Sequence, residues 1–135
     1  SEDELRGVTF AFVCVDKGES RKGVIELLIK FGIPFIDVGM GLDRKSDSIN
    51  GMIRVVYFSK EESQATLDKN IVPTSDPEDD IYRNNIQISE LNALNACLAV
   101  IKYKKLIGFY SENDTFYYLL SNLESLKVMT EWFNE

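Results

Sequence analysis

The amino-acid sequence predicts an α/β fold, and the prediction rests on three patterns in its first forty residues. An almost unbroken run of apolar and β-branched residues at 8–15 is typical of a strand that is buried on both faces of a parallel sheet. A helical apolar stripe follows it, and a second apolar run occupies residues 35–39. A strand, a helix and a strand in so short a span form a βαβ unit, so the two strands should be parallel.

The helix of this unit is predicted from four apolar side chains at spacings i, i+3, i+4 and i+7, which share one helical face. They are Val24, Leu27, Leu28 and Phe31. Ser20 is a plausible N-cap, because its hydroxyl can accept a hydrogen bond from a free amide of the first turn. Gly32 should end the helix, and Pro34 prevents its return.

The remaining elements are predicted to be antiparallel strands and one long helix. A polar loop at 43–50 leads to a strand at 52–58, which should be antiparallel to its predecessor because the connection is short. A helix is predicted at 89–106, and its apolar residues extend most of the way around it. Such a helix should be buried between layers or against a second subunit. Two short strands are expected at about 115–120 and 125–130.

Composition and charge exclude several classes of function. The 135-residue chain contains 15 Lys and Arg against 22 Asp and Glu, which gives a net charge of −7. That acidity disfavours nucleic acid and anionic membrane surfaces as partners, because both attract basic proteins. The chain has no histidine, which excludes His-based triads, His metal sites and His general bases. It shows no signal peptide and no apolar run long enough to cross a membrane, so we expect a cytoplasmic protein.

The two cysteines, Cys14 and Cys97, each lie in an apolar run and form no CxxC pair. A zinc ribbon or a thioredoxin-type redox site is therefore not expected. We expect both thiols to be buried and reduced, with Cys97 as a packing residue of the long helix and not a catalytic nucleophile.

Asp16 is the first candidate for chemistry, because it directly follows the first buried strand, where open α/β sheets place their ligand crevices. A carboxylate there can hold Mg²⁺ and, through it, a nucleotide phosphate. The alternative is a helix cap or a solvated loop residue. Arg21, five positions later, either complements a phosphate or lies on the helix surface.

Three other features carry less information. The glycine pair at 39–41 lacks the third glycine and the helix of a dinucleotide-binding loop. Asn92 and Asn95 share one face of the long helix and are interpreted as a hydrogen-bonding pair at an interface or core edge. The acidic stretch 76–80 lacks the spacing of a calcium loop and is interpreted as solvated. The residues alone thus support an α/β half-domain with a ligand-facing aspartate, and they specify no reaction.

Several motifs, taken in order, resemble the ThiF/MoeB/HesA superfamily, which includes the ubiquitin-activating enzymes. In that family a strand ends in Asp, with Arg five positions later, as at residues 12–21 here. A helix and a G-x-P-x-I strand entry follow, matched at 32–36, and a glycine-containing loop then feeds a strand, matched at 39–54. A long apolar helix that ends near glycine is matched at 88–108. The resemblance covers about residues 8–130.

This resemblance implies a Rossmann-like three-layer half-domain, with residues 1–135 forming the second part of the family's adenylation domain. The family's N-terminal half holds the glycine-rich nucleotide loop and the Arg and Lys that grip ATP, and it is absent from this sequence. We therefore expect the chain to be a fragment that is inactive alone. Residues 59–87 would be the crossover loop that guides the tail of a carrier protein to the nucleotide.

The resemblance further implies that the whole protein uses ATP and Mg²⁺ to adenylate the C-terminal glycine of a ubiquitin-like or sulfur-carrier protein. Asp16 would be the catalytic carboxylate beside the metal and the α-phosphate, with Lys17 and Arg21 in nucleotide binding. Lys17 stands where the family usually has Asn. The zinc-binding cysteine pairs of many members are absent, and the crossover loop has no cysteine for a thioester or persulfide step.

Two alternatives stay open. The segment could be a non-catalytic dimerisation or carrier-docking module, since family members commonly form dimers and the long helix is apolar on most sides; a homodimer is expected in either case. It could also be half of a Rossmann enzyme that binds NAD, which the pairing of Asp16 with Arg21 disfavours.

Overall fold

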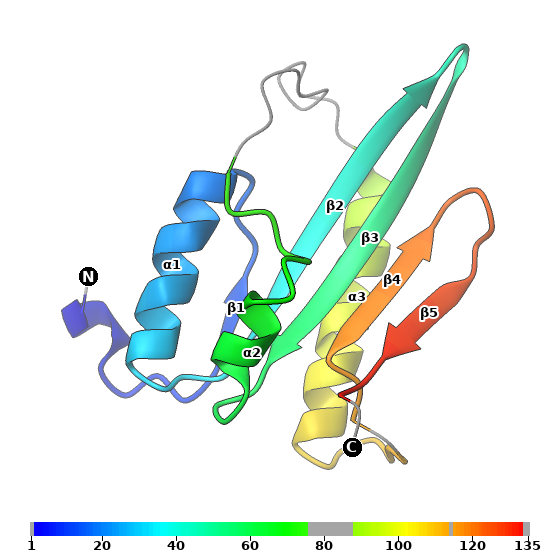
Figure 1. Cartoon of the computed structure of the whole chain (residues 1–135). Coiled ribbons are helices and arrows are strands. Elements are labelled where there is room, and N and C mark those ends of the chain that lie inside the picture. Colours follow the sequence, from blue (N-terminus) through cyan, green and yellow to red (C-terminus); the bar gives the residue numbers. More distant parts are fainter. Residues whose placement is uncertain (1, 76–87, 114, 134–135) are drawn as a thin grey trace.

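The computed structural model describes residues 2–75, 88–113 and 115–133, which form a five-stranded mixed sheet with helices on both faces (Figure 1). The strands lie side by side in chain order. They are β1 (Ala11–Val13), β2 (Phe35–Lys45), β3 (Ser48–Phe58), β4 (Tyr118–Asn122) and β5 (Val128–Glu131). Only β1 and β2 are parallel, and every later pair is antiparallel. The predicted α/β class, mixed sheet and βαβ unit are confirmed.

Helices form the outer layers. Helix α1 (Gly18–Lys30) and the short α2 (Ser63–Leu67) cover one face of the sheet, and α3 (Ser89–Leu106) covers the other (Figure 1). A 3-10 turn at Glu2–Leu5 precedes β1. The 59–75 part of the predicted crossover loop contains α2, and residues 76–87 lie outside the described part of the chain.

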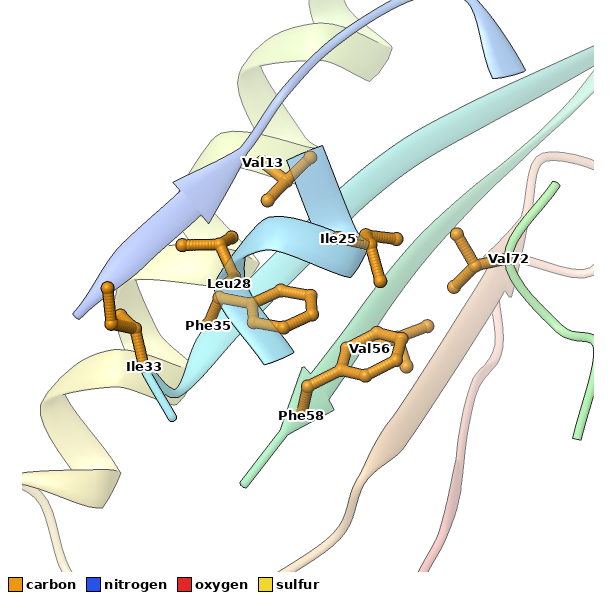
Figure 2. Close-up of a cluster of buried hydrophobic side chains, with 8 residues drawn as sticks. All are labelled: Val13, Ile25, Leu28, Ile33, Phe35, Val56, Phe58 and Val72. Carbon is orange, nitrogen blue, oxygen red and sulfur yellow. The ribbon is translucent and has the colours of Figure 1, made fainter. Parts of the chain in front are cut away.

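One hydrophobic core fills the space between α1 and the sheet (Figure 2). Its centre is the stacked pair Phe35 and Phe58, whose ring centroids lie 4.3 Å apart across the β2–β3 ladder. Ile25 and Leu28 of α1 pack onto this pair from above, and Val72 closes one side. The burial of these aromatic and aliphatic side chains fixes α1 on the sheet.

A second core lies between the opposite face of the sheet and α3. Ile36, Val55 and Leu119 contribute one residue each from three neighbouring strands, and Ala99 contacts them from the helix. Because side chains alternate along a strand, Asp37 and Arg54 then face the α1 side.

The strand boundaries differ from the prediction in two places. The run at 8–15 forms a strand only over Ala11–Val13, so the first strand is shorter than expected. The predicted polar loop at 43–50 is wrong, because β2 and β3 continue as a regular ladder down to Lys45 opposite Ser48. Only Ser46 and Asp47 form the turn. Beyond β1 and β4 this hairpin projects as an arm (Figure 1), so most of its residues are polar although they are strand residues.

Helix α1 also differs in its start and in its buried face. It begins at Gly18, with Lys17 as N-cap, and Ser20 lies inside the first turn. The buried side chains are Arg21, Ile25 and Leu28, while Val24 and Phe31 of the predicted stripe are exposed. The predicted end is confirmed, since Gly32 follows the helix with a positive φ of 64°.

Helix α3 has the predicted boundaries and ends before Gly108, which has a φ of 84°. Its burial is one-sided: Leu91, Asn95, Ala99 and Lys102 face the sheet. The opposite face is exposed in this chain and includes Cys97. Cys14 is exposed too, so the expectation that both thiols are buried is wrong for this chain.

Candidate functional site

Asp16 lies in the turn between the carboxyl end of β1 and the first residue of α1. Its side chain is exposed, as is that of Lys17. Lys17 is the N-cap of α1 and makes no side-chain hydrogen bond to the first turn of the helix. An exposed carboxylate beside a helix N-terminus at the end of a parallel strand has the position predicted for a ligand-facing group.

Arg21 does not lie on the surface, because its side chain is 95% buried beneath this turn. Its Nε donates to Oδ1 of Asp37 at 3.0 Å, and its Nη2 donates to the carbonyl of Val15 at 2.6 Å. Its Nη1 donates to the carbonyl of Pro73 at 3.2 Å. One guanidinium thus holds three segments together: the turn after β1 directly before Asp16, the start of β2, and the chain that follows α2.

Asp37 is the centre of this cluster and is fully buried on β2. Besides Arg21 it contacts a second guanidinium, since Nη2 of Arg54 lies 3.5 Å from Oδ2. Burial raises the pKa of Asp37, and the two arginines oppose that rise. Burial likewise lowers the pKa of Arg54, and the negative charge of Asp37 opposes that change. With two guanidiniums on one carboxylate, the ionised cluster carries one net positive charge.

Gly39 makes room for Arg54. The two residues are opposite each other in the β2–β3 ladder, and a Cβ on Gly39 would collide with Nη2 of Arg54. The carbonyl of Gly39 accepts a hydrogen bond from Nδ2 of Asn95 at 2.8 Å, which ties α3 to the same position. The glycines at 39 and 41 are therefore strand residues, and the first of them serves close packing.

The chain after α2 lies against the N-terminus of α1. Pro73 is bound by Arg21, and a Cβ on Gly18 would be 2.5 Å from the carbonyl oxygen of Ser75. Gly18 is therefore needed for this close approach. Residues 71–75, the last described part of the predicted crossover loop, therefore lie beside the β1–α1 turn that carries Asp16.

The sequence patterns did not indicate Asp37 or Arg54 as site residues. Each interrupts an apolar strand: Asp37 stands between Ile36 and Val38, and Arg54 between Ile53 and Val55. A charged residue in such a run must find an opposite charge if it is buried, and this was the available signal. The asparagine pair is also revised, since Asn95 is buried and bonds to Gly39 whereas Asn92 is exposed.

Within the described residues, no group of three or more His, Cys, Asp or Glu side chains is placed to hold a metal ion. The acidic stretch 76–80 lies outside them. The same part of the chain contains no helix whose length and hydropathy would let it cross a membrane. No known protein-family model matches the chain, and no curated protein is similar enough to count as a match.

Proposed function

We propose that this chain supplies the second half of an adenylation domain, which activates the C-terminal glycine of a ubiquitin-like or sulfur-carrier protein with ATP. One observation supports the proposal: residues 71–75 of the predicted crossover loop lie against the same β1–α1 turn that presents Asp16. A loop that guides a carrier tail to a nucleotide has to begin beside the group that acts on that nucleotide. The resemblance described above supplies the reaction class, and the local geometry is compatible with it.

The proposed role of Asp16 fits the residues around it. Mg²⁺ in nucleotide sites is commonly held by one or two carboxylates together with substrate phosphates and water, so one exposed carboxylate is a sufficient protein ligand. The metal ion would neutralise charge that develops on the α-phosphate during displacement of pyrophosphate. Asp16 would orient that ion electrostatically and would not act as a base. The neighbouring exposed Lys17 can offer its ammonium group to a phosphate oxygen.

Arg21 enters the proposal in a different role from the one expected. Three of its nitrogens are committed to Asp37, Val15 and Pro73, and its side chain is buried. We therefore assign Arg21 as a positioning residue. It holds the carbonyl of Val15, directly before Asp16, and the carbonyl of Pro73 in the predicted crossover loop. The phosphate contact expected of Arg21 stays a prediction.

The test is ATP–pyrophosphate exchange by the complete gene product that contains this chain, with each ubiquitin-like and sulfur-carrier protein of the same organism as the acceptor. Asp16→Ala should lower the exchange rate by at least about a hundredfold, the scale lost on removing a group that stabilises transition-state charge. Asp47→Ala, which removes an exposed carboxylate from the hairpin turn, is the matched control and should retain full activity. Unchanged exchange in Asp16→Ala would exclude the proposed role of this carboxylate.

A non-catalytic assembly module is the second candidate, and the outer face of α3 favours it. Leu94, Val100 and Ile101 are each at least 40% exposed on a helix whose inner face is already packed. Contiguous exposed apolar side chains are typical of a surface that another protein covers. Homodimerisation through α3 is compatible with either function. A cytoplasmic location is part of the same proposal, and there the free thiols of Cys14 and Cys97 would stay reduced.

A further inference from the structure

Strand β5 forms one edge of the sheet, and among the described residues it pairs only with β4. All four of its side chains are exposed, and none belongs to either hydrophobic core. The outer edge of such a strand offers a row of N–H and C=O groups with which another chain can pair. The edge at β5 is therefore a candidate surface for an added strand.

Apolar side chains gather at this edge without being buried. Leu126 is 75% exposed, the highest value among the large apolar side chains that the structure describes, and Met129 is 63% exposed. Val128 and Trp132 are exposed as well. Neighbouring exposed apolar side chains are typical of a surface that another protein covers.

Leu126 is held at this edge by a hydrogen-bonded turn. Its amide donates to the carbonyl of Asn122 at 2.9 Å, and Oδ1 of Asn122 accepts from the amide of Ser125 at 2.9 Å. The φ of Leu126 is 56°, a left-handed conformation that is an outlier for a bulky side chain. A leucine that is strained, exposed and outside both cores indicates a role beyond the packing of this chain.

The charges that flank β5 are complementary to those of a second copy of the same strand. Lys127 and Glu131 lie two positions before and two positions after Met129. In an antiparallel pair with its two-fold axis at Met129, each Lys127 lies opposite Glu131 of the other copy. The same register sets Leu126 opposite Trp132, and no neighbouring register opposes the two charges. Opposite charges and aromatic–aliphatic pairs directly across two strands are stabilising.

We propose that β5 pairs with β5 of a second copy of this chain, antiparallel and centred on Met129, so that the two sheets join into one. Glu131 also accepts a hydrogen bond from the hydroxyl of Tyr117 at 3.2 Å, which orients its carboxylate before the copies meet. This surface is separate from the outer face of α3, and it does not depend on the adenylation reaction.

The test is disulfide cross-linking in the 135-residue chain, with Cys14 and Cys97 replaced by Ser because both thiols are exposed. Directly opposite residues of an antiparallel pair have Cα atoms about 4.5–5.5 Å apart, a separation that a disulfide spans. Met129→Cys should therefore form a covalent dimer under mild oxidation. In the same register Thr130 lies about 7–8 Å from its own copy, so Thr130→Cys should cross-link on the order of tenfold more slowly.

Val24→Cys, at an exposed position on α1, measures cross-linking by random collision. If Met129→Cys forms its dimer no faster than Thr130→Cys or Val24→Cys, the proposal is wrong. All three positions are exposed, so each variant should fold as the unmodified chain does.

A charge reversal tests the register a second time. In the Met129→Cys chain, Lys127→Glu makes both charge pairs repulsive and should slow cross-linking by about threefold or more. Adding Glu131→Lys to the same chain restores opposite charges across the strands and should restore the rate. A double variant as slow as Lys127→Glu alone would contradict the pairing of Lys127 with Glu131.

Discussion

Arg21 of α1 and Asp37 of β2 form a buried ion pair, with 3.0 Å between Nε and Oδ1. The two residues are 16 positions apart, and their contact joins the first turn of α1 to β2 beneath the turn that carries Asp16. The same guanidinium also donates to the carbonyls of Val15 and Pro73. Arg21 therefore links the turn that carries Asp16 to the predicted crossover loop. The shape of this edge of the sheet therefore depends on one arginine.

Replacement of Arg21 should be strongly destabilising. Arg21→Gln leaves the fully buried Asp37 with only the long contact to Arg54, and we expect a loss of about 3 kcal/mol in the free energy of unfolding. Chemical denaturation at pH 7 measures it. Lys22→Gln, which removes the adjacent exposed charge from the same helix, should stay within about 0.5 kcal/mol of the unmodified chain. Equal stability of the two variants would show that the ion pair does not organise this edge.

Two glycine substitutions should have opposite effects. Gly39→Ala places a Cβ against the guanidinium of Arg54 and should cost about 1–3 kcal/mol, as overpacking does elsewhere. Gly23→Ala adds a Cβ in open space inside α1, where alanine is the better helix former, and should stabilise by up to about 1 kcal/mol. Thermal unfolding of both variants checks the prediction, and a stable Gly39→Ala would contradict the packing described for Arg54.

Lys102 should make the stability of the protein depend on pH on the alkaline side. Its side chain is buried, bonds to Glu112 at 3.2 Å and lies 3.8 Å from the ring centroid of Phe116. Burial lowers the pKa of Lys102, with the contact to Glu112 opposing the change. Between this lowered pKa and the ordinary value, the unfolded chain binds more protons than the folded one. The contribution of Lys102 to stability should therefore rise with pH across that interval.

The pH prediction is measured as a difference between variants. The free energy of unfolding is determined from pH 7 to 10 for the unmodified chain and for Lys102→Met, so that other titrating groups cancel. The unmodified chain should gain stability relative to Lys102→Met as the pH rises. Lys22→Met, at an exposed position, is the control for the loss of one positive charge. A relative loss of stability with rising pH would mean that the pKa of Lys102 is raised and not lowered.

The outer face of α3 should mediate self-association. Val100→Glu places a charge among exposed apolar side chains, so it should abolish a dimer while leaving monomer stability within about 0.5 kcal/mol. Val24→Glu makes the same change at an exposed position on α1 and should leave the dimer intact. Sedimentation of the three proteins at tens of micromolar is the measurement, with Val128→Glu present in each so that β5 does not pair. A monomeric Val128→Glu chain, or a dimer that survives Val100→Glu, would count against this surface.

The sequence was sufficient for the order and type of most elements. The boundaries of α3 and the helix stop at Gly32 could be predicted because they depend on local signals, namely apolar periodicity and a residue that tolerates positive φ. The strands at 43–50 could not be predicted, because a hairpin that projects from the sheet carries mostly polar residues and its sequence resembles a loop. Strand length there is decided by pairing, which single residues do not reveal.

The candidate site was only half predictable. Asp16 could be found because it follows a recognisable strand. The burial of Arg21 was missed because an amphipathic stripe is identified by its apolar members, and this stripe contains a charged one. Its partner Asp37 lies on another element. The register that sets Arg54 opposite Gly39 follows from a two-residue hairpin turn, whereas the sequence predicts a loop at 43–50. A buried charge cluster is a tertiary feature, and its members become connected only when the strands are paired.

The most direct test of whether this chain is the second half of an adenylation domain is to sequence the reading frame directly upstream of Ser1. About 130 to 150 codons are needed, because that is the usual size of a domain. If this chain is the second half of such a domain, these codons encode a strand, a G-x-G-x-x-G loop and a helix, followed by an Arg and a Lys that can bind ATP. A frame that begins at or near Ser1, or one that encodes no phosphate-binding loop, would contradict the catalytic proposal and leave an assembly module as the better description.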